Sequence, residues 1–165
     1  NRLPLSDRIR LFNSVVVPCV LYGAGVWTVT VSCEQRLLRT QRKMLRWIVQ
    51  TIRLPEENWV EYIKRATHVA EDVAAKHGSK NWVQLQRHRQ WMLAGKVASA
   101  EDGRWSNRIL GWKPWFRSLS CRPVGHPCKR WDDNITQLAG GGWVQSARDS
   151  GLWNALSYGF IHFKQ

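Results

Sequence analysis

Apolar side chains near the start of the chain recur every three or four residues. Within residues 5–22 they form a stripe at helical spacing, made of Ile9, Phe12, Val16 and Val20. Ser6 is placed to cap the start of this helix, and Asp7 lies in the first turn, where the helix dipole favours a carboxylate. Pro18 cannot donate the N–H that a helix interior needs, so we expect a kink or an interruption there.

A second and clearer helical pattern covers residues 32–50. The stripe at this spacing consists of Leu37, Leu38, Gln41, Met44, Leu45, Ile48 and Val49. Away from this stripe lie the basic residues Arg36, Arg39, Arg42, Lys43 and Arg46. Ser32 and Gln35 have the spacing of a capping box at the helix start. We therefore predict an amphipathic helix whose cationic face suits a phosphate backbone, the alternative being a face that is only solvated.

Further helices are expected in the rest of the chain, at 56–77, 80–99, 131–138 and 143–160. The first of them follows Pro55 and stops at Gly78, and Ser79 is placed to cap the next one. Segment 101–130 is rich in Gly, Pro, Arg and Trp, which indicates a loop with short helical turns. No alternating pattern predicts a strand. The fold class expected is all-α: an irregular bundle of about five to six helices with a Gly/Pro/Trp-rich loop segment.

The charge balance narrows the class of partner. The chain has 165 residues and a formal net charge of +13 at pH 7. Such an excess indicates a polyanionic partner, most commonly nucleic acid, with an anionic membrane surface as the rival. No apolar run approaches the ~20 residues that span a bilayer, so we expect no membrane span, and we take nucleic acid rather than a membrane as the partner. No secretory signal heads the chain, so we expect an intracellular location.

The chain is also rich in tryptophan, with 11 of these residues. Indole rings pack well in protein cores, and they also stack on unpaired bases. We expect most of them to lie in the core, because so many exposed rings would make a soluble domain prone to aggregation.

Two clusters have residue types that bind metal ions. Cys121, His126 and Cys128 could bind zinc, but structural zinc sites use four ligands and usually a closer cysteine pair. Asp132 and Asp133 could hold Mg²⁺, but adjacent residues of a helix point in different directions. We interpret the first cluster as loop residues and the second as acids at a helix N-terminus. The sequence predicts no metal site and no catalytic residue in this chain.

Five segments spread along nearly the whole chain resemble, in the same order, segments of a known protein family. They are RLFNSVVVPCVLYGAGVW at 10–27, LLRTQRKMLRWIVQ at 37–50, QWMLAGKVAS at 90–99, CRPVGHPCKRWDDNI at 121–135 and WVQSARDSGLWNALSYGF at 143–160. Together they resemble the region that follows the polymerase palm in LINE-type non-LTR retrotransposon reverse transcriptases. The chain departs from the family pattern at His126, where arginine is usual, at Cys128, where a basic residue is usual, and at Lys96, where histidine is expected after the glycine.

The resemblance implies a thumb-like helical region at 1–52 and a Trp-rich helical C-terminal tail region at 53–165. Such a region would grip RNA or a DNA primer–template, beside the upstream polymerase palm of the same polyprotein, in the nucleus. The catalytic aspartates and the Mg²⁺ of the parent polymerase would lie upstream, so no cofactor is expected in this chain. Besides the helix cations above, the expected nucleic-acid contacts are Arg122, Lys129 and Arg130, with Trp115 or Trp131 stacking on a base.

Two other functions remain open. The first is a stand-alone helical module that binds nucleic acid or protein without any polymerase role, stabilised by zinc through Cys121 and Cys128. The second is a protein-interaction or membrane-surface module that does not bind nucleic acid.

Overall fold

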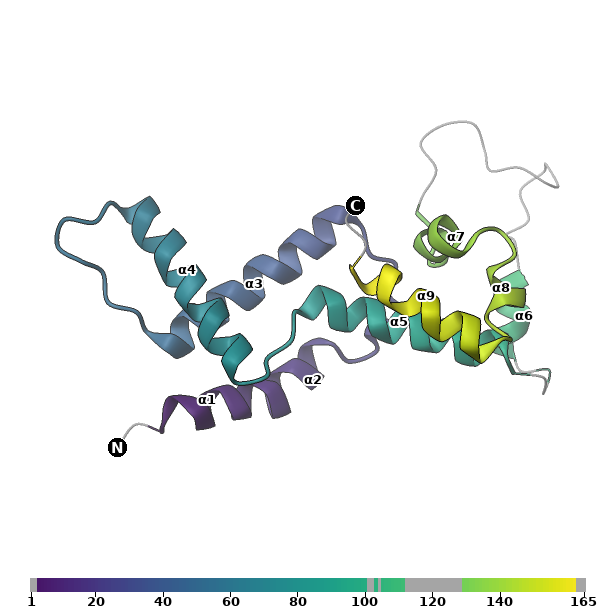
Figure 1. The fold of residues 1–165 in the computed structure, drawn as a ribbon, viewed down its shortest axis with the longest axis horizontal. Helices are drawn as coiled ribbons and strands as arrows, with labels where there is room; N and C mark the ends of the chain where they lie inside the picture. Colours follow the sequence, from purple (N-terminus) through teal and green to yellow (C-terminus); the bar gives the residue numbers. More distant parts are fainter. Residues whose placement is uncertain (1–2, 101–102, 104, 112–128, 163–165) are drawn as a thin grey trace. The chain divides into compact units, whose positions relative to one another are not determined.

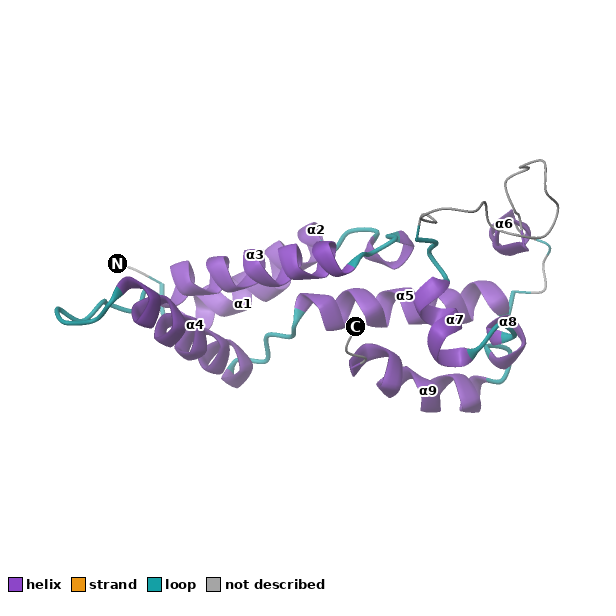
Figure 2. Cartoon of the chain, turned by 90° about the horizontal axis from the view of Figure 1, so that it is seen from above, coloured by secondary structure: helices purple, strands orange, loops and turns teal. Residues whose placement is uncertain are grey.

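The computed structural model describes residues 3–100, 103, 105–111 and 129–162. In this part of the chain every regular element is helical and no strand occurs (Figure 2), so the predicted all-α fold class is confirmed. The chain divides into two compact units (helices labelled in Figure 1): unit 1 holds 1–23 and 31–86, and unit 2 holds 24–30 and 87–165. The expected boundary at residue 52 comes from the family resemblance and not from the packing of the helices, and it stays a prediction.

Unit 1 begins with three consecutive helical segments: α1 (Leu5–Leu11), the π-helical η1 (Phe12–Val16) and α2 (Val17–Val20). Pro18 lies in the first turn of α2, where a missing N–H is tolerated. The interruption expected at Pro18 therefore takes the form of a change in helical winding just before it, in η1. Helical structure ends at Val20, and Gly23 follows with φ +63°, a value that favours glycine.

The π-helical segment changes which side of this run is buried. A π turn holds more residues than an α turn, so it rotates every later side chain around the axis. Up to Phe12 the predicted stripe is buried. After it, the structure buries Val17 and Leu21, whereas the predicted Val16 and Val20 are half-buried. The prediction was wrong by one residue because it assumed an unbroken α-helical period.

The next two helices, α3 (Val31–Val49) and α4 (Trp59–Lys76), pack on each other within unit 1. The side of α4 that is buried carries only small side chains, Ala66, Ala70 and Ala74, at spacings of four residues. Short side chains on one helix face allow a second helix to approach closely, and the spacing places them in one row. The predicted helical pattern of this segment is confirmed, although the helix begins at Trp59 rather than at residue 56.

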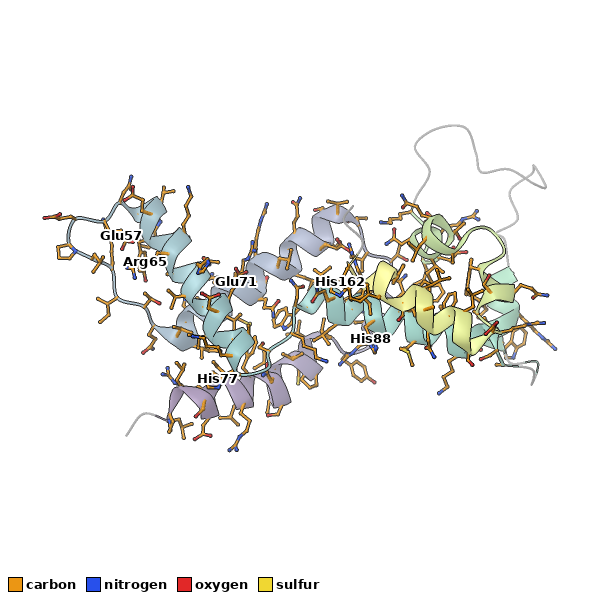
Figure 3. All side chains as sticks on the ribbon, in the orientation of Figure 1. Glu57, Arg65, Glu71, His77, His88 and His162 are labelled. Carbon is orange, nitrogen blue, oxygen red and sulfur yellow. The ribbon has the colours of Figure 1, made fainter. Side chains whose placement is uncertain are left out.

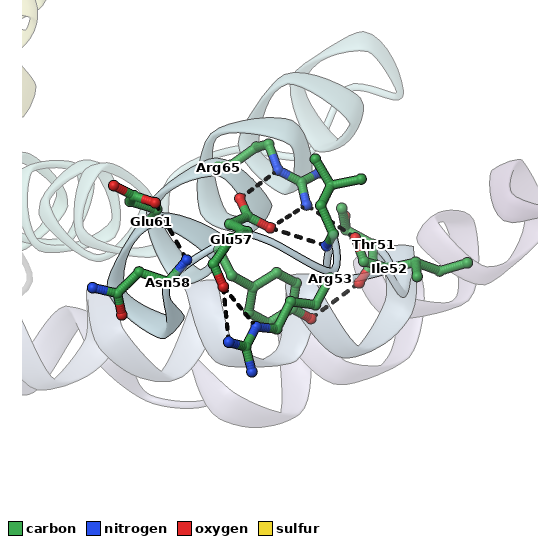
Figure 4. Close-up of polar contacts among 9 residues, drawn as sticks. Thr51, Ile52, Arg53, Glu57, Asn58, Glu61 and Arg65 are labelled. Atoms are coloured by element: carbon green, nitrogen blue, oxygen red, sulfur yellow. Dashed lines mark hydrogen bonds and ion pairs between the residues drawn. The ribbon is translucent and has the colours of Figure 1, made fainter.

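Hydrogen bonds hold the connection between α3 and α4 (Figure 4). The Arg65 guanidinium donates to both carboxylate oxygens of Glu57 at 2.8 Å and to the Ile52 carbonyl at 2.9 Å. The Tyr62 hydroxyl donates to the Thr51 carbonyl at 3.0 Å. The hydrogen bonds from Arg65 favour the ionised carboxylate, and they lower the pKa of Glu57 from its ordinary value.

Gln41 joins α3 to the start of α5 (Trp82–Ala98). Its side-chain nitrogen donates to the Lys80 carbonyl at 2.8 Å, and its oxygen accepts the Trp82 backbone N–H at 3.0 Å. The Trp82 ring is fully buried and stacks on Phe12, with centroids 5.8 Å apart. A buried amide in the apolar stripe thus satisfies two backbone groups that have no other helix partner.

The predicted serine caps are wrong. Helices α1 and α3 begin at Leu5 and Val31, so Ser6 and Ser32 lie inside them. At the start of α5, Asn81 accepts the Val83 N–H at 2.8 Å, so Asn81 caps this helix in place of Ser79. Asparagine is a strong cap, and its side chain reaches the second N–H of the helix from the adjoining position.

Unit 2 contains the later part of α5 with α6 (Trp105–Gly111), α7 (Asp133–Ala139), α8 (Trp143–Ser146) and α9 (Ser150–His162). Its apolar core is built from Trp91, Ala94, Ala98, Ile135, Trp143, Ala147, Trp153 and Phe160. Three tryptophans at its centre confirm for this unit that indole rings pack the core. In the described part of the chain, Trp47, Trp59 and Trp105 are instead exposed.

The predicted helix at 143–160 is in fact two helices. The Asp149 side chain accepts the backbone N–H groups of Gly151 at 2.9 Å and Leu152 at 3.1 Å. An aspartate that binds the N–H groups two and three positions later starts a new helix, so the chain turns between α8 and α9. Within the described ranges, no helix combines the length and the apolarity needed to cross a membrane.

Candidate nucleic-acid interface

Helix α3 has three different sides within unit 1. One side enters the core and buries Gln41 and Leu45. A second side contacts α4 and carries Arg42 and Arg46. The third side is exposed and carries Arg36, Arg39, Lys43 and Trp47. At about 100° per residue, these four side chains fall within roughly 80° of arc, and we call them the exposed α3 face.

Arg42 and Arg46 are engaged with α4. The Arg42 Nε lies 2.7 Å from the carboxylate of Glu71, a residue of α4 that Figure 3 labels. Arg46 donates to the Thr67 hydroxyl at 2.9 Å. Both partners of the ion pair are nearly half exposed, so the pair contributes at most about 1 kcal/mol and chiefly orients the two helices. Two of the five predicted helix cations therefore have an observed role between helices.

Arg36, Arg39 and Lys43 are arranged differently. All three are exposed, and in the described part of the chain no acidic side chain lies within ion-pair distance of any of them. They are spaced three and four residues apart, so they form one row along the helix. Three adjacent cations without counter-charges produce a positive potential that attracts a polyanion.

Trp47 extends this row towards the C-terminal end of α3. Its side chain is 64% exposed, and the Lys43 Nζ lies 4.9 Å from its ring centroid. The sequence-based prediction named Trp115 and Trp131 as stacking candidates and did not include Trp47. The signal was present: Trp47 follows Lys43 by four residues and Arg39 by eight, the spacing of one helix face.

The remaining predicted contacts come from the tail. Arg122 and Trp115 lie outside the described residues, as do Cys121, His126 and Cys128 of the zinc hypothesis. Lys129 is half-buried and Arg130 is exposed, both just before α7 in unit 2. Their contact with nucleic acid stays a prediction.

Trp131 has a packing role in unit 2. Its indole N–H donates to the Gly25 carbonyl at 2.7 Å, and its ring meets Trp143 edge-on with centroids 6.4 Å apart. Its own carbonyl accepts a hydrogen bond from Gln90 at 2.6 Å. These contacts give the half-buried ring an observed role in packing, and its stacking on a base stays a prediction.

No metal centre is visible among the described residues, where no three His, Cys, Asp or Glu side chains gather closely enough to hold an ion. Asp132 immediately precedes α7, and Asp133 accepts the Arg130 backbone N–H at 2.7 Å. The two acids thus lie at a helix N-terminus, where the sequence placed them, and one of them is used in the local turn.

The chain is similar to an uncharacterized transposon-derived protein of Caenorhabditis elegans. The two are 29% identical over 158 residues, which cover 90% of this chain and 53% of the relative. The chain thus spans about half the length of that relative. No family model and no solved structure matches the chain. The similarity supports a transposon-related origin for this protein.

Proposed function

We propose that this chain is the nucleic-acid-binding C-terminal part of a retroelement reverse transcriptase. Its exposed α3 face would hold RNA or a primer–template through the phosphate backbone. The observation that carries the proposal is the row of Arg36, Arg39 and Lys43, which are exposed and have no acidic partner in the described residues.

Three further facts support this function. The formal net charge of +13 favours a polyanionic partner. A transposon-derived relative covers nearly the whole chain. One of the segments that resemble non-LTR reverse transcriptases, 37–50, covers most of α3, including Arg39, Lys43 and Trp47 of the exposed face.

The proposed role is binding and not chemistry. Phosphate contacts by arginine and lysine fix the position of a nucleic acid without reading its sequence. Mg²⁺ and the catalytic carboxylates would belong to the upstream palm, which this chain would assist by holding the template.

The test is a binding titration with labelled single-stranded RNA and a primer–template duplex across a salt series. We compare the wild type with a triple variant, Arg36→Gln, Arg39→Gln and Lys43→Gln. Each lost phosphate contact should lower the slope of log K against log salt by about 0.7 for a single strand and about 0.9 for a duplex. The triple variant should therefore lose roughly 2 to 3 units of slope.

A charge-matched control separates this face from the overall charge. The variant Lys64→Gln, Lys76→Gln and Arg148→Gln removes three exposed cations elsewhere and lowers the net charge equally. It should keep most of the wild-type slope. Equal losses in the two variants would show diffuse attraction, and an unbound wild type at low salt would remove the proposed function.

A further inference from the structure

We infer that Trp47 provides a stacking platform for an unpaired base, so that the ligand of the exposed α3 face is single-stranded nucleic acid or a single-stranded end. The inference rests on the proposed nucleic-acid binding and adds a choice of substrate class to it.

Trp47 is exposed at one end of the row of cations on α3. The ring is 64% exposed although the side chain is large and apolar, and it lies at the end of the row that begins at Arg36. From Arg36 to Trp47 the helix rises about 16 Å, at ~1.5 Å per residue. A strand lying along this row would thus meet three cations and then an indole ring.

The side chains of Lys43 and Trp47 are in contact with each other. The ammonium lies 4.9 Å from the ring centroid, within the range of a cation–π interaction. This contact restrains the indole on the helix surface and uses one of its faces. The ring therefore combines a restrained orientation with exposed π surface, and both properties favour stacking of a base.

The choice of single strands follows from which groups a nucleic acid exposes. Phosphates are accessible in both a duplex and a single strand, so the cations of the face do not distinguish the two. The faces of paired bases are covered by their neighbours, whereas an unpaired base can leave its stack and lie on an aromatic ring. Trp47 should therefore add affinity for unpaired bases only.

The experiment uses the variants Trp47→Leu and Trp47→Phe, with single-stranded RNA, single-stranded DNA and a blunt duplex of equal length as probes. Trp47→Leu keeps apolar bulk without a ring, and Trp47→Phe keeps a ring. Trp59→Leu is the matched control, since Trp59 is 59% exposed on α4 of the same unit. Because these side chains are exposed, we expect their variants to keep the wild-type melting temperature.

Trp47→Leu should bind single strands about 5- to 150-fold more weakly, the range for one stacked base, and bind the duplex as before. Trp47→Phe should retain most of the affinity, and Trp59→Leu all of it. The salt slope should not change in Trp47→Leu, because stacking releases no counterions. The single-stranded RNA and DNA probes show whether the sugar matters.

Two results would overturn the inference while leaving the proposed function intact. In the first, Trp47→Leu binds single strands as tightly as the wild type, which would make Trp47 a contact for protein or no contact. In the second, it weakens duplex and single strand equally. A wild type without salt-dependent binding would instead show that the proposed function itself fails, and the inference with it.

Discussion

The indole rings of Trp91 and Trp153 stack at a centroid separation of 3.7 Å, and each ring donates its N–H to the backbone carbonyl of the other residue. The N–H to carbonyl distances are 3.1 and 3.2 Å. Burial of an indole normally requires a partner for its N–H. Here each tryptophan satisfies the other, so α5 and α9 are joined by one reciprocal contact in the core of unit 2.

Truncating this pair should destabilise the protein strongly. For Trp153→Ala we expect a loss of about 3–5 kcal/mol in the free energy of unfolding, from the lost transfer energy and the cavity that remains. Trp105→Ala is the control, because Trp105 is 74% exposed, and it should change stability by less than about 0.5 kcal/mol. Urea denaturation followed by circular dichroism measures both. Similar small losses in the two variants would show that the stacked pair is not part of the core.

Gly95 makes room for this contact. A Cβ placed on Gly95 would lie 2.6 Å from the Trp153 Nε1, too close for two unbonded atoms. Gly95→Ala should therefore cost about 1–3 kcal/mol, although alanine is otherwise the better helix former by about 1 kcal/mol. Gly141→Ala has open space around the new methyl group and should be nearly neutral. A Gly95→Ala protein that melts at a higher temperature than the wild type would contradict this packing.

The Gln41 side chain should contribute to the stability of the fold, although it is polar and lies in an apolar stripe. Its amide satisfies the Lys80 carbonyl and the Trp82 N–H, so Gln41→Leu would leave both groups without their partner. We expect a loss of about 1–3 kcal/mol in thermal or urea unfolding. Gln35→Leu alters an exposed glutamine of the same helix and should stay within about 0.5 kcal/mol of the wild type. Equal stability of the two variants would rule out a structural role for the Gln41 amide.

The Glu57–Arg65 pair predicts a specific dependence of stability on pH. The pKa of Glu57 is lower in the folded protein than its ordinary value of 4.5, chiefly because Arg65 donates hydrogen bonds to it. Folding therefore favours the ionised carboxylate, and this contribution is complete above pH 4.5 and is lost as the pH falls through the lower, folded pKa. The wild type should be more stable than Glu57→Gln at neutral pH, with a difference that narrows in acid.

Urea unfolding of the two proteins across the acidic range checks this. A difference between wild type and Glu57→Gln that stays constant below pH 4.5 would contradict the assignment to the Arg65 contact.

Helices α3 and α4 were predictable because their apolar residues recur at a clear helical period, and the all-α class followed from this pattern and from the lack of an alternating one. The incorrect predictions concern positions where the local sequence is compatible with two different structures. Ser79 and Asn81 are both good caps, and the choice between them depends on where the chain can turn. The π turn before Pro18 depends on packing of the whole segment, so the buried pair Val17 and Leu21 was missed by one position.

The candidate site shows the same limit. The sequence pattern predicted five cations on α3. It could not show that Arg42 contacts α4 whereas Lys43 is exposed to solvent, because that difference depends on where α4 packs. Glu71 and Thr67, far along the chain, decide which cations are engaged. The position of Trp47 beside Lys43 could have been recognised from their four-residue spacing alone.

Lysine footprinting tests most directly whether the exposed α3 face contacts nucleic acid. The protein is acetylated with and without saturating single-stranded RNA, and mass spectrometry measures the rate at each lysine. Lys43 should be protected by the RNA, whereas the exposed Lys64 and Lys76 on α4 should react at the same rate in both samples. Protection of Lys64 and Lys76 with no change at Lys43 would contradict binding at this face.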